Sequence, residues 1–445
     1  MNNQFSLLKE IRFRPFFFTQ FLGAFNDNVF KTALITLVAF HTASLTDMSG
    51  KTLATLLPGV FILPFFLFSA TAGQIADKYE KAQLIRFVKV FEIGLMLFAS
   101  AGFFLHNIWL LCAALFMMGM HSTLFGPVKY SYLPQHLNAN ELIGGNGMVE
   151  MGSFIAILLG QVLGAWLATI HNHALFTSIA ILVIAVLGYL TSRGVPRSPA
   201  ADSQLNINWN PITETIKSIK LVWSQPKIWL TIVAISWFWF YGATLIAQLP
   251  NLAKTVLHGD ESLFILLLSL FSIGIGAGSL LCEKLSKGKL ELGLVLFGAI
   301  GLSIFAADLY STSTSIHAAS RGILTTINYQ HFLSKFANWR LLADVALIGL
   351  FGGFYIVPLY VFLQTHAKSG FQSRVIAANN IVNALFMVLS AGFSVAIMNG
   401  GYSIPQLFLA TALLNLIVAI YLCIRQPDYL ISFMRWIKSL LSTVS

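Results

Sequence analysis

The sequence GAFNDNVFK, residues 23–31, lies inside an apolar run from about Phe16 to Phe40. That run is long enough to cross a bilayer, which takes roughly 20 apolar residues. Asp27 stands near the middle of the run, where inserting a carboxylate into lipid costs roughly 3 kcal/mol. Lys31 follows four residues later on the same helical face, so the two side chains can pair. Ionisable residues inside a membrane span are functional by default, so this stretch predicts a substrate or ion pathway.

Two amides widen the same polar patch, because Asn26 and Asn28 flank Asp27. A polar patch at this depth should face a cavity or another helix, since lipid offers it no hydrogen bonds. The plainer alternative is an internal ion pair that only fixes helix packing. Both interpretations turn the patch away from lipid.

Composition places the whole chain in the membrane. Of 445 residues, 57% are hydrophobic and only 10% are charged, which excludes a soluble globular protein. The first apolar run is too long, and too polar in its middle, for a cleavable signal. The three cysteines lie in or at the ends of apolar runs, without metal spacing or an obvious disulfide partner. We therefore expect an all-α polytopic membrane protein with no metal and no cofactor.

Twelve apolar runs divide the chain into six helices plus six. They fall at about 14–41, 52–72, 83–104, 108–127, 142–169, 175–192, 227–249, 262–282, 292–311, 341–363, 377–399 and 404–424. A polar segment with three prolines separates the sixth run from the seventh. The expected domains are an N-terminal six-helix bundle at 1–192, a cytoplasmic linker with an amphipathic helix at 193–226, a C-terminal six-helix bundle at 227–424 and a cytoplasmic amphipathic tail at 425–445.

The distribution of basic residues predicts the orientation. One side of the predicted topology, which holds both termini and the central linker, carries 21 Lys and Arg, and the other side carries five. The positive-inside rule then places both termini and the linker in the cytoplasm. The same distribution accounts for the net charge of +10 through topology and attraction to anionic lipid, without nucleic acid.

The two halves resemble parallel repeats. Residues 144–150 are similar to residues 377–383 at an offset of 233, and residues 21–24 are similar to residues 240–243 at an offset of 219. Matches in the same order along both halves favour a duplicated six-helix unit. Substrate sites in such proteins lie between the repeats near the bilayer midplane.

The loop after the second run, GQIADKYEK at 73–81, resembles the cytoplasmic loop signature of the major facilitator superfamily. In that family the loop latches the two halves together on the cytoplasmic side. Here the resemblance assigns the latch to Gly73, Asp77 and Lys78. Asp77 would accept from backbone N–H groups at the positive start of the eleventh run, near Ser373, with Arg374 as its charge partner. In the second half Glu283 is the matching acid, one residue out of register.

A closer resemblance is to bacterial lysophospholipid transporters of that superfamily. It rests on GAFNDNVFK at 23–31, on FGPVKY at 125–130 and on SRVIAANN at 373–380. The resemblance implies twelve membrane helices in two pseudo-symmetric six-helix bundles. It also implies that lysophosphatidylethanolamine and lysophosphatidylglycerol move from the outer to the inner leaflet of the bacterial inner membrane by alternating access. Within that family, the sequence is most similar to the branch that is fused to acyltransferase and acyl-ACP synthetase modules. Such an enzyme is therefore an expected partner.

One span departs from that family. The stretch WFWFYG at 237–242 has no basic residue, whereas some members carry an Arg there. This difference leaves headgroup recognition by the seventh run undecided. Recognition would then depend on other polar residues of the chain.

A lysolipid site needs a polar surface for the headgroup and an apolar surface for the acyl chain. Lys31 or Lys129 would meet the phosphate, and Asp27 or Glu150 would meet an ammonium. Buried amides would add hydrogen bonds, and aromatic side chains would line the acyl surface. The candidate central-cavity residues are Asn26, Asp27, Asn28, Lys31, Lys129, Asn146, Glu150, Trp239, Tyr241, Tyr355, Asn379 and Asn383.

Plainer interpretations stand beside several candidates. Lys129 lies near a helix end, where a lysine can snorkel to the headgroups. The aromatic residues individually suit lipid-facing packing. Glu92 follows Arg86 and Lys89 on a helix expected at the outside of the fold, which favours a local ion pair. His121 is expected to be a packed polar side chain, with proton relay as the sharper alternative.

Two other functions are alternatives to lipid transport. A proton-coupled exporter of drugs or small metabolites on the same fold would use Asp27, Glu150 and His121 as proton carriers. A membrane-embedded acyltransferase commonly uses His-x4-Asp, and no His in the sequence has Asp five residues later. The sequence also lacks the phosphate-binding loop of an ATPase. We therefore expect a transporter and not an enzyme.

Overall fold

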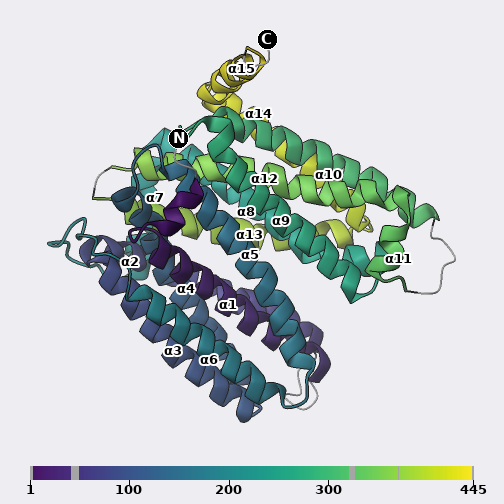
Figure 1. The fold of residues 1–445 in the computed structure, drawn as a ribbon, viewed down its shortest axis with the longest axis horizontal. Helices are drawn as coiled ribbons and strands as arrows, with labels where there is room; N and C mark the ends of the chain where they lie inside the picture. Colours follow the sequence, from purple (N-terminus) through teal and green to yellow (C-terminus); the bar gives the residue numbers. More distant parts are fainter. Residues whose placement is uncertain (1–3, 42–49, 320–325, 369, 443–445) are drawn as a thin grey trace. The chain divides into compact units, whose positions relative to one another are not determined.

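The computed structural model describes residues 4–41, 50–319, 326–368 and 370–442. Within these ranges the regular structure is helical, apart from one isolated bridge between Gly259 and Ile327. Twelve long helices follow the twelve predicted runs (Figure 1). They are α1 (Arg14–His41), α2 (Gly50–Lys78), α3 (Lys81–Phe104), α4 (Ile108–His136), α5 (Leu142–Thr169), α6 (His173–Ser192), α8 (Pro226–Asn251), α9 (Glu261–Ser286), α10 (Gly293–Ala319), α12 (Trp339–His366), α13 (Gln372–Asn399) and α14 (Ile404–Arg425).

Among the described residues, eleven of these helices are long and apolar enough to cross a membrane. The exception is α1, which has 28 residues but carries the polar stretch that lowers its hydropathy. Three shorter helices complete the fold: α7 (Pro211–Trp223), α11 (Tyr329–Ser334) and α15 (Asp428–Leu441). The predicted all-α polytopic architecture is confirmed.

Some helices extend beyond their apolar runs. The helix α4 continues through Pro127 and Pro134 to His136, although an internal proline removes a backbone hydrogen bond. The first turn of α3 is capped by Glu80, which accepts from two backbone N–H groups of that turn. The first turn of α7 is capped in the same way by Asn210, as the Asn-Pro pair in the sequence predicts.

The chain forms two compact units. Unit 1 comprises residues 1–138, 155–228 and 363–384, and unit 2 comprises residues 139–154, 229–362 and 385–445. The division follows contacts and not chain order, so α5 and α13 contribute to both units. The domain boundaries expected from the sequence stay predictions.

Glycines bring the helices of unit 1 into backbone contact. A Cβ on Gly119 of α4 would lie 2.2 Å from the carbonyl oxygen of Phe61 in α2. On α5, Gly160 and Gly164 meet the backbone of α1, where a Cβ on Gly164 would lie 2.4 Å from the Val29 carbonyl oxygen. Small residues four apart are typical of close packing between membrane helices. An apolar core fills the space between α1, α3, α4 and α6.

Unit 2 repeats this packing. Gly274 and Gly278 of α9 meet backbone carbonyls of α12, and Gly349 and Gly353 of α12 meet α9 in return. The helix pair α10 and α14 also packs together, as α3 and α6 do in unit 1. The pairs α9–α12 and α10–α14 occupy the same order in the second half as α2–α4 and α3–α6 in the first. This correspondence supports the predicted duplication.

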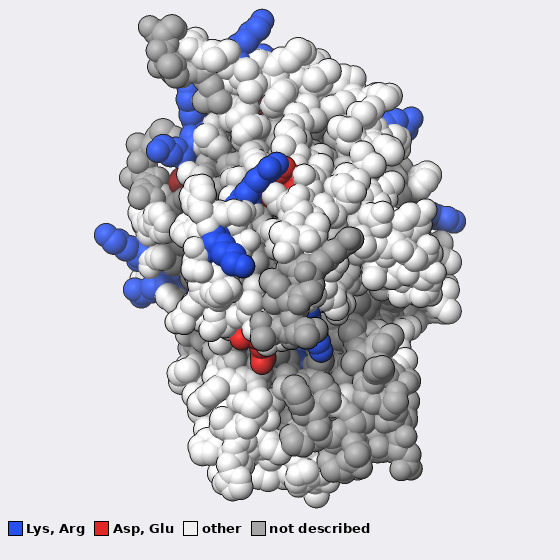
Figure 2. Space-filling view, turned by 90° about the vertical axis from the view of Figure 1, so that its right-hand side faces the viewer, with Lys and Arg blue, Asp and Glu red and all other residues white. Residues whose placement is uncertain are grey.

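Two short helices are amphipathic. In α15, Tyr429 and Trp436 are buried, and the Trp436 indole donates to the Leu285 carbonyl, whereas Leu430 and Met434 are exposed. In α7, Ile212 is 70% exposed. Figure 2 shows a described surface that is mostly uncharged and on which Lys and Arg predominate over Asp and Glu. The pattern suits helices that lie on a membrane surface, which stays a prediction.

Candidate functional site

A buried ion pair forms the core of a polar cluster in unit 1. Lys89 and Glu92 lie on α3 with their Nζ and Oε2 atoms 2.6 Å apart, and both side chains are 0% exposed. The Asn26 amide of α1 donates to Glu92 Oε1 at 2.7 Å. The carboxylate of Glu92 is therefore compensated by one charge and one neutral donor. Partners of this kind are what a carboxylate requires in a dry interior.

His121 of α4 connects this pair to Asp27. Its Nε2 atom lies 3.3 Å from Glu92 Oε2, and its Nδ1 atom lies 3.9 Å from Asp27 Oδ1. The Ser122 hydroxyl donates to Asp27 Oδ2 at 2.7 Å. The Asp27 side chain is 14% exposed, against 3% for His121. Asp27 is therefore the least buried end of a continuous line of polar side chains.

The sequence makes room for this cluster with glycine. A Cβ on Gly23 would lie 2.6 Å from Lys89 Nζ, and one on Gly188 would lie 3.5 Å from the same atom. The Phe125 ring covers the cluster, with Lys89 Nζ at 5.6 Å from its centroid and the His121 ring stacked at 6.5 Å. Residues of two motifs singled out in the sequence, GAFNDNVFK and FGPVKY, thus surround a lysine that neither motif contains.

Asp27 and Lys31, which could pair by their spacing, form no ion pair within 4 Å in the structure. Lys31 instead places its Nζ atom 4.5 Å from the centroid of the Phe61 ring, a cation–π contact. Asp27 takes its hydrogen bond from α4, because a donor there lies closer than the lysine on its own helix. Asn28 donates to the Ala24 carbonyl of its own helix at 2.7 Å.

The local ion pair expected for Glu92 is present. Glu92 pairs with Lys89, and both side chains of the pair are fully buried. Arg86 takes no part and donates to the Val195 carbonyl of the linker at 3.0 Å. His121 is packed, as expected, but between two carboxylates. The sequence signal for this buried pair is an acid and a base three residues apart inside an apolar run.

The other candidates of unit 1 lie on α4 and α13. Lys129 Nζ lies 5.1 Å from the centroid of the Tyr130 ring. Asn379 is fully buried, and neither polar atom of its amide has a hydrogen-bond partner. Asn383 is buried one helical turn further along α13.

The remaining cavity candidates belong to unit 2. Asn146 and Glu150 are buried on α5, and the Asn146 amide donates to the Leu142 carbonyl. Three aromatic side chains use their polar atoms inside the unit: Trp239 donates to Tyr360, Tyr241 to the Leu302 carbonyl and Tyr355 to the Ala234 carbonyl. Tyr241 and Tyr355 are buried, so lipid-facing packing is wrong for Tyr241. The structure thus places the candidate residues in two separate groups, one in each unit.

The loop signature forms contacts with the start of α13 inside unit 1. The buried Asp77 carboxylate accepts from the Ser373 backbone N–H at 3.1 Å and from Arg374 Nε at 3.0 Å. A Cβ on Gly73 would lie 2.7 Å from Ala377 Cβ, so α2 and α13 meet at a glycine. These are the partners that the sequence suggests for Asp77, and its role as a latch stays a prediction.

Two further latch candidates contact residues that are close to them in the sequence. Lys78 Nζ lies 5.9 Å from the centroid of the Tyr79 ring. Glu283 lies in the last turn of α9, where its carbonyl accepts from Gly288 N–H. The second-half latch stays a prediction as well.

The linker covers the loop signature, which the sequence did not predict. The Gln74 side chain and the Asn208 backbone exchange two hydrogen bonds, at 2.8 and 3.1 Å. Asp202 N–H donates to the Asp77 carbonyl at 2.9 Å. Ser198 is fully buried, donates its backbone N–H to Glu80 at 2.6 Å and bonds the His136 ring at 2.5 Å. The linker is therefore fixed to unit 1 over at least ten residues.

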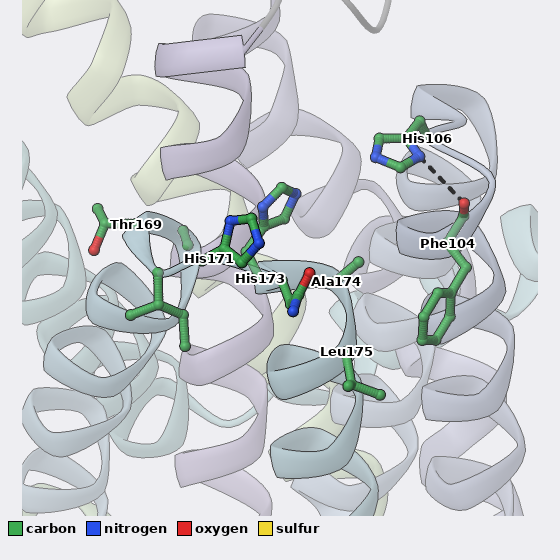
Figure 3. A pocket seen from close by; sticks show the side chains of 10 residues that line it. Phe104, His106, Thr169, His171, His173, Ala174 and Leu175 are labelled. Atoms are coloured by element: carbon green, nitrogen blue, oxygen red, sulfur yellow. Dashed lines mark hydrogen bonds between the residues drawn. The ribbon is translucent and has the colours of Figure 1, made fainter.

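A surface pocket of unit 1 collects three histidines (Figure 3). His106 comes from the α3–α4 connection, His171 from the α5–α6 connection, and His173 is the first residue of α6. The rings of His106 and His173 are 6.4 Å apart, and His106 Nδ1 bonds the Phe104 carbonyl. In the described part of the chain, no three His, Cys, Asp or Glu side chains are arranged to hold a metal ion.

Long apolar helices, with a line of charged side chains buried among those of unit 1, define a polytopic membrane protein. The family model of the Major Facilitator Superfamily matches residues 16–327. Because this match covers more than half of the chain, the chain belongs to the Major Facilitator Superfamily.

Curated relatives and solved structures agree with this assignment. A protein named lysophospholipid transporter LplT from Klebsiella pneumoniae (strain 342) is 26% identical over 391 residues, covering 86% of this chain and 87% of the relative. A protein of the same name from Escherichia coli O157:H7 is 27% identical over 394 residues, covering 87% and 89%.

Two solved structures share the fold. The human organic anion transporter MFSD10 has a TM-score of 0.71 at 11% identity, covering 92% of this chain and 99% of that one. The E. coli fucose:proton symporter FucP has a TM-score of 0.67 at 12% identity, covering 93% and 98%. At these identities the likeness concerns the fold alone.

Proposed function

We propose that this protein moves lysophospholipids from the outer to the inner leaflet of a bacterial inner membrane by alternating access. The observation that carries the proposal is the similarity to relatives named lysophospholipid transporter along 86% of the chain. We take lysophosphatidylethanolamine and lysophosphatidylglycerol as the substrates. The membrane location and a cytoplasmic position of both termini belong to the same proposal.

Unit 1 offers a headgroup site. Asp27 is partly exposed, and its carboxylate has a hydroxyl partner but no lysine or arginine within 4 Å among the described residues. Lys31 lies one helical turn away on α1 and touches an aromatic ring. A carboxylate and an ammonium at this spacing complement the ammonium and phosphate of an ethanolamine headgroup.

Unit 2 offers an apolar surface. The polar atoms of Trp239, Tyr241 and Tyr355 are hydrogen-bonded inside the unit, which leaves their rings as apolar surface. Asn146 and Glu150 are buried polar residues of the same unit. We propose that these residues and Asn379 and Asn383 of unit 1 line the path of the lipid.

Chemistry on the lipid would take place elsewhere. We propose that the chain is a transporter without enzymatic activity. An acyltransferase or acyl-ACP synthetase would then act on the delivered lysolipid. A separate enzyme fits the proposal because flipping changes the leaflet of a lipid and leaves its bonds intact.

The test is uptake of labelled lysophosphatidylethanolamine by spheroplasts that do or do not produce the protein. Uptake should depend on the protein and should fall at least tenfold with Asp27→Asn, while Glu261→Gln, an acid-to-amide change at an exposed position, should leave it unchanged. If the protein is correctly inserted and the strain that produces it takes up no more lipid than the strain that does not, the proposal is overturned. A screen of small proton-coupled substrates would then test the exporter alternative.

A further inference from the structure

The line of side chains from Glu92 through His121 to Asp27 has an unusual feature. Each ring nitrogen of His121 faces a carboxylate oxygen, at 3.3 Å on one side and 3.9 Å on the other. Neither nitrogen has another hydrogen-bond partner, and the side chain is buried. A neutral imidazole has one N–H and one lone pair, and its lone pair repels a carboxylate.

We propose that the Glu92–His121–Asp27 line holds one exchangeable proton, which a cationic group of the ligand displaces at Asp27. The reference state has a neutral His121 imidazole and two charged carboxylates, those of Glu92 and Asp27. The exchangeable proton is the one added to this state. It resides either on the imidazole, which then donates from both nitrogens, or on the Asp27 carboxyl. Both forms remove the repulsion, and the proton moves between them without other chemistry.

The charges around His121 locate the proton at the Asp27 end. Lys89 of α3 neutralises Glu92 at 2.6 Å. Lys31 of α1 points to the ring of Phe61. The helix α2 also packs against α4, and residues 56–75 of α2 contain no ionisable side chain. His121 is therefore the basic group nearest to Asp27, whereas Glu92 already has a lysine.

Burial shows where the proton can leave. Glu92 is sealed at 0% exposure and fixed by Asn26, whereas the Asp27 side chain is 14% exposed. Exchange with water therefore takes place at Asp27, where Ser122 is the neutral donor. The proton is released to water or taken from it as a hydrogen ion.

This arrangement predicts proton-linked headgroup selection, a consequence that rests on the proposed function. An ethanolamine headgroup brings its own cation to Asp27, so the proton leaves as that lipid binds. A glycerol headgroup brings no cation, so the proton stays. Linkage then requires binding of the ethanolamine lipid to strengthen as pH rises, by up to about tenfold per pH unit while the line is mostly protonated. Binding of the glycerol lipid releases no proton, so it should not change over the same range.

The proton site can be tested without lipid. Infrared difference spectra of the full chain in detergent, recorded between two pH values, should contain the carbonyl signal of a carboxylic acid. The signal should disappear in Asp27→Asn and change its midpoint in His121→Gln. The matched control is His331→Gln, an exposed histidine on α11, which should leave the signal unchanged. Absence of a signal that depends on Asp27 or His121 would overturn the proposal.

A milder variant protects this test against misfolding. Ser122→Ala removes the hydroxyl that donates to the Asp27 carboxylate and leaves every charge in place. Loss of that donor changes the balance between the charged and the neutral carboxyl, so the midpoint should shift. An unchanged midpoint in a folded Ser122→Ala protein would count against Asp27 as the proton carrier.

The second arm adds short-chain lysophosphatidylethanolamine and lysophosphatidylglycerol to wild-type protein in weakly buffered detergent with an indicator dye. The ethanolamine lipid should release up to one proton per molecule bound, and the glycerol lipid should release none. Equal release by both lipids would overturn headgroup-linked displacement while leaving the transporter proposal intact. Binding of neither lipid at any pH would overturn the proposed function, and the infrared arm would still decide the proton site.

Discussion

At the scale of single residues, one lysine sets the sequence requirements around it. The Lys89 ammonium needs a carboxylate partner and space between α1, α3 and α6, and Gly23 and Gly188 leave that space. Mid-membrane polar residues could be found in the sequence because charges are rare there. Their partners could not, because Asn26 and Glu92 are 66 residues apart and Ser122 and Asp27 are 95 residues apart.

The first prediction concerns Gly23→Ala. The new Cβ would lie 2.6 Å from Lys89 Nζ and would push the ammonium away from Glu92. We expect a loss of about 1–3 kcal/mol in the free energy of unfolding, as for other overpacked sites. Thermal unfolding in detergent measures it. Gly94→Ala on α3 is the control, because nothing lies within 4 Å of its Cβ position and the protein should be unaffected.

The second prediction concerns the ion pair itself. Lys89→Met leaves the Glu92 carboxylate buried without a counter-charge and should cost about 3–5 kcal/mol of stability. Adding Glu92→Gln removes the uncompensated charge, so the double variant should regain a large part of that loss. Chemical or thermal unfolding of both variants measures the difference. Additive losses would show that the two side chains do not act as a pair.

At the scale of helices, hydropathy predicts the number and positions of the long helices. Each of the twelve apolar runs became one long helix, and the Asn-Pro pair at 210–211 became the start of α7. Helix ends were less accurate, since α4 continues through two prolines. The docked linker was missed because residues 194–210 carry no periodic pattern and are held by individual hydrogen bonds.

The contact between α2 and α13 gives the third prediction. Asp77→Asn removes the charge that holds Arg374 and weakens acceptance from Ser373. We expect the contact between α2 and α13 to open more often. The measurement is thiol labelling at Ser131→Cys, a buried position whose hydroxyl lies 3.1 Å from that of Ser373, with the parent protein as background. A labelling rate that rises severalfold supports a latch, and an unchanged rate argues against it.

The docked linker gives the fourth prediction. Gln74→Leu removes both hydrogen bonds to Asn208 and should release the linker from unit 1. Limited proteolysis should then cut residues 199–207 at least severalfold faster. Gln83→Leu is the control, because its side chain is exposed on α3. Equal cleavage of the two variants would mean that these bonds do not hold the linker.

At the scale of the whole molecule, the same kinds of contact occur twice, as the predicted duplication would require. Glycine-lined contacts join α2 to α4 in one unit and α9 to α12 in the other. The charged line, however, is in unit 1, while unit 2 contributes hydrogen-bonded aromatic residues.

The most direct test of the account is lipid movement by the purified protein. Proteoliposomes carrying labelled lysophosphatidylethanolamine in the outer leaflet would be sampled by extraction with albumin, which removes only outer-leaflet lipid. We predict a protected fraction that grows with wild-type protein and stays at the level of empty liposomes with Asp27→Asn, which should still insert and fold. Equal protection by empty liposomes and wild-type protein, or by wild type and Asp27→Asn, would contradict the central claim that Asp27 lies at the site of lipid transport.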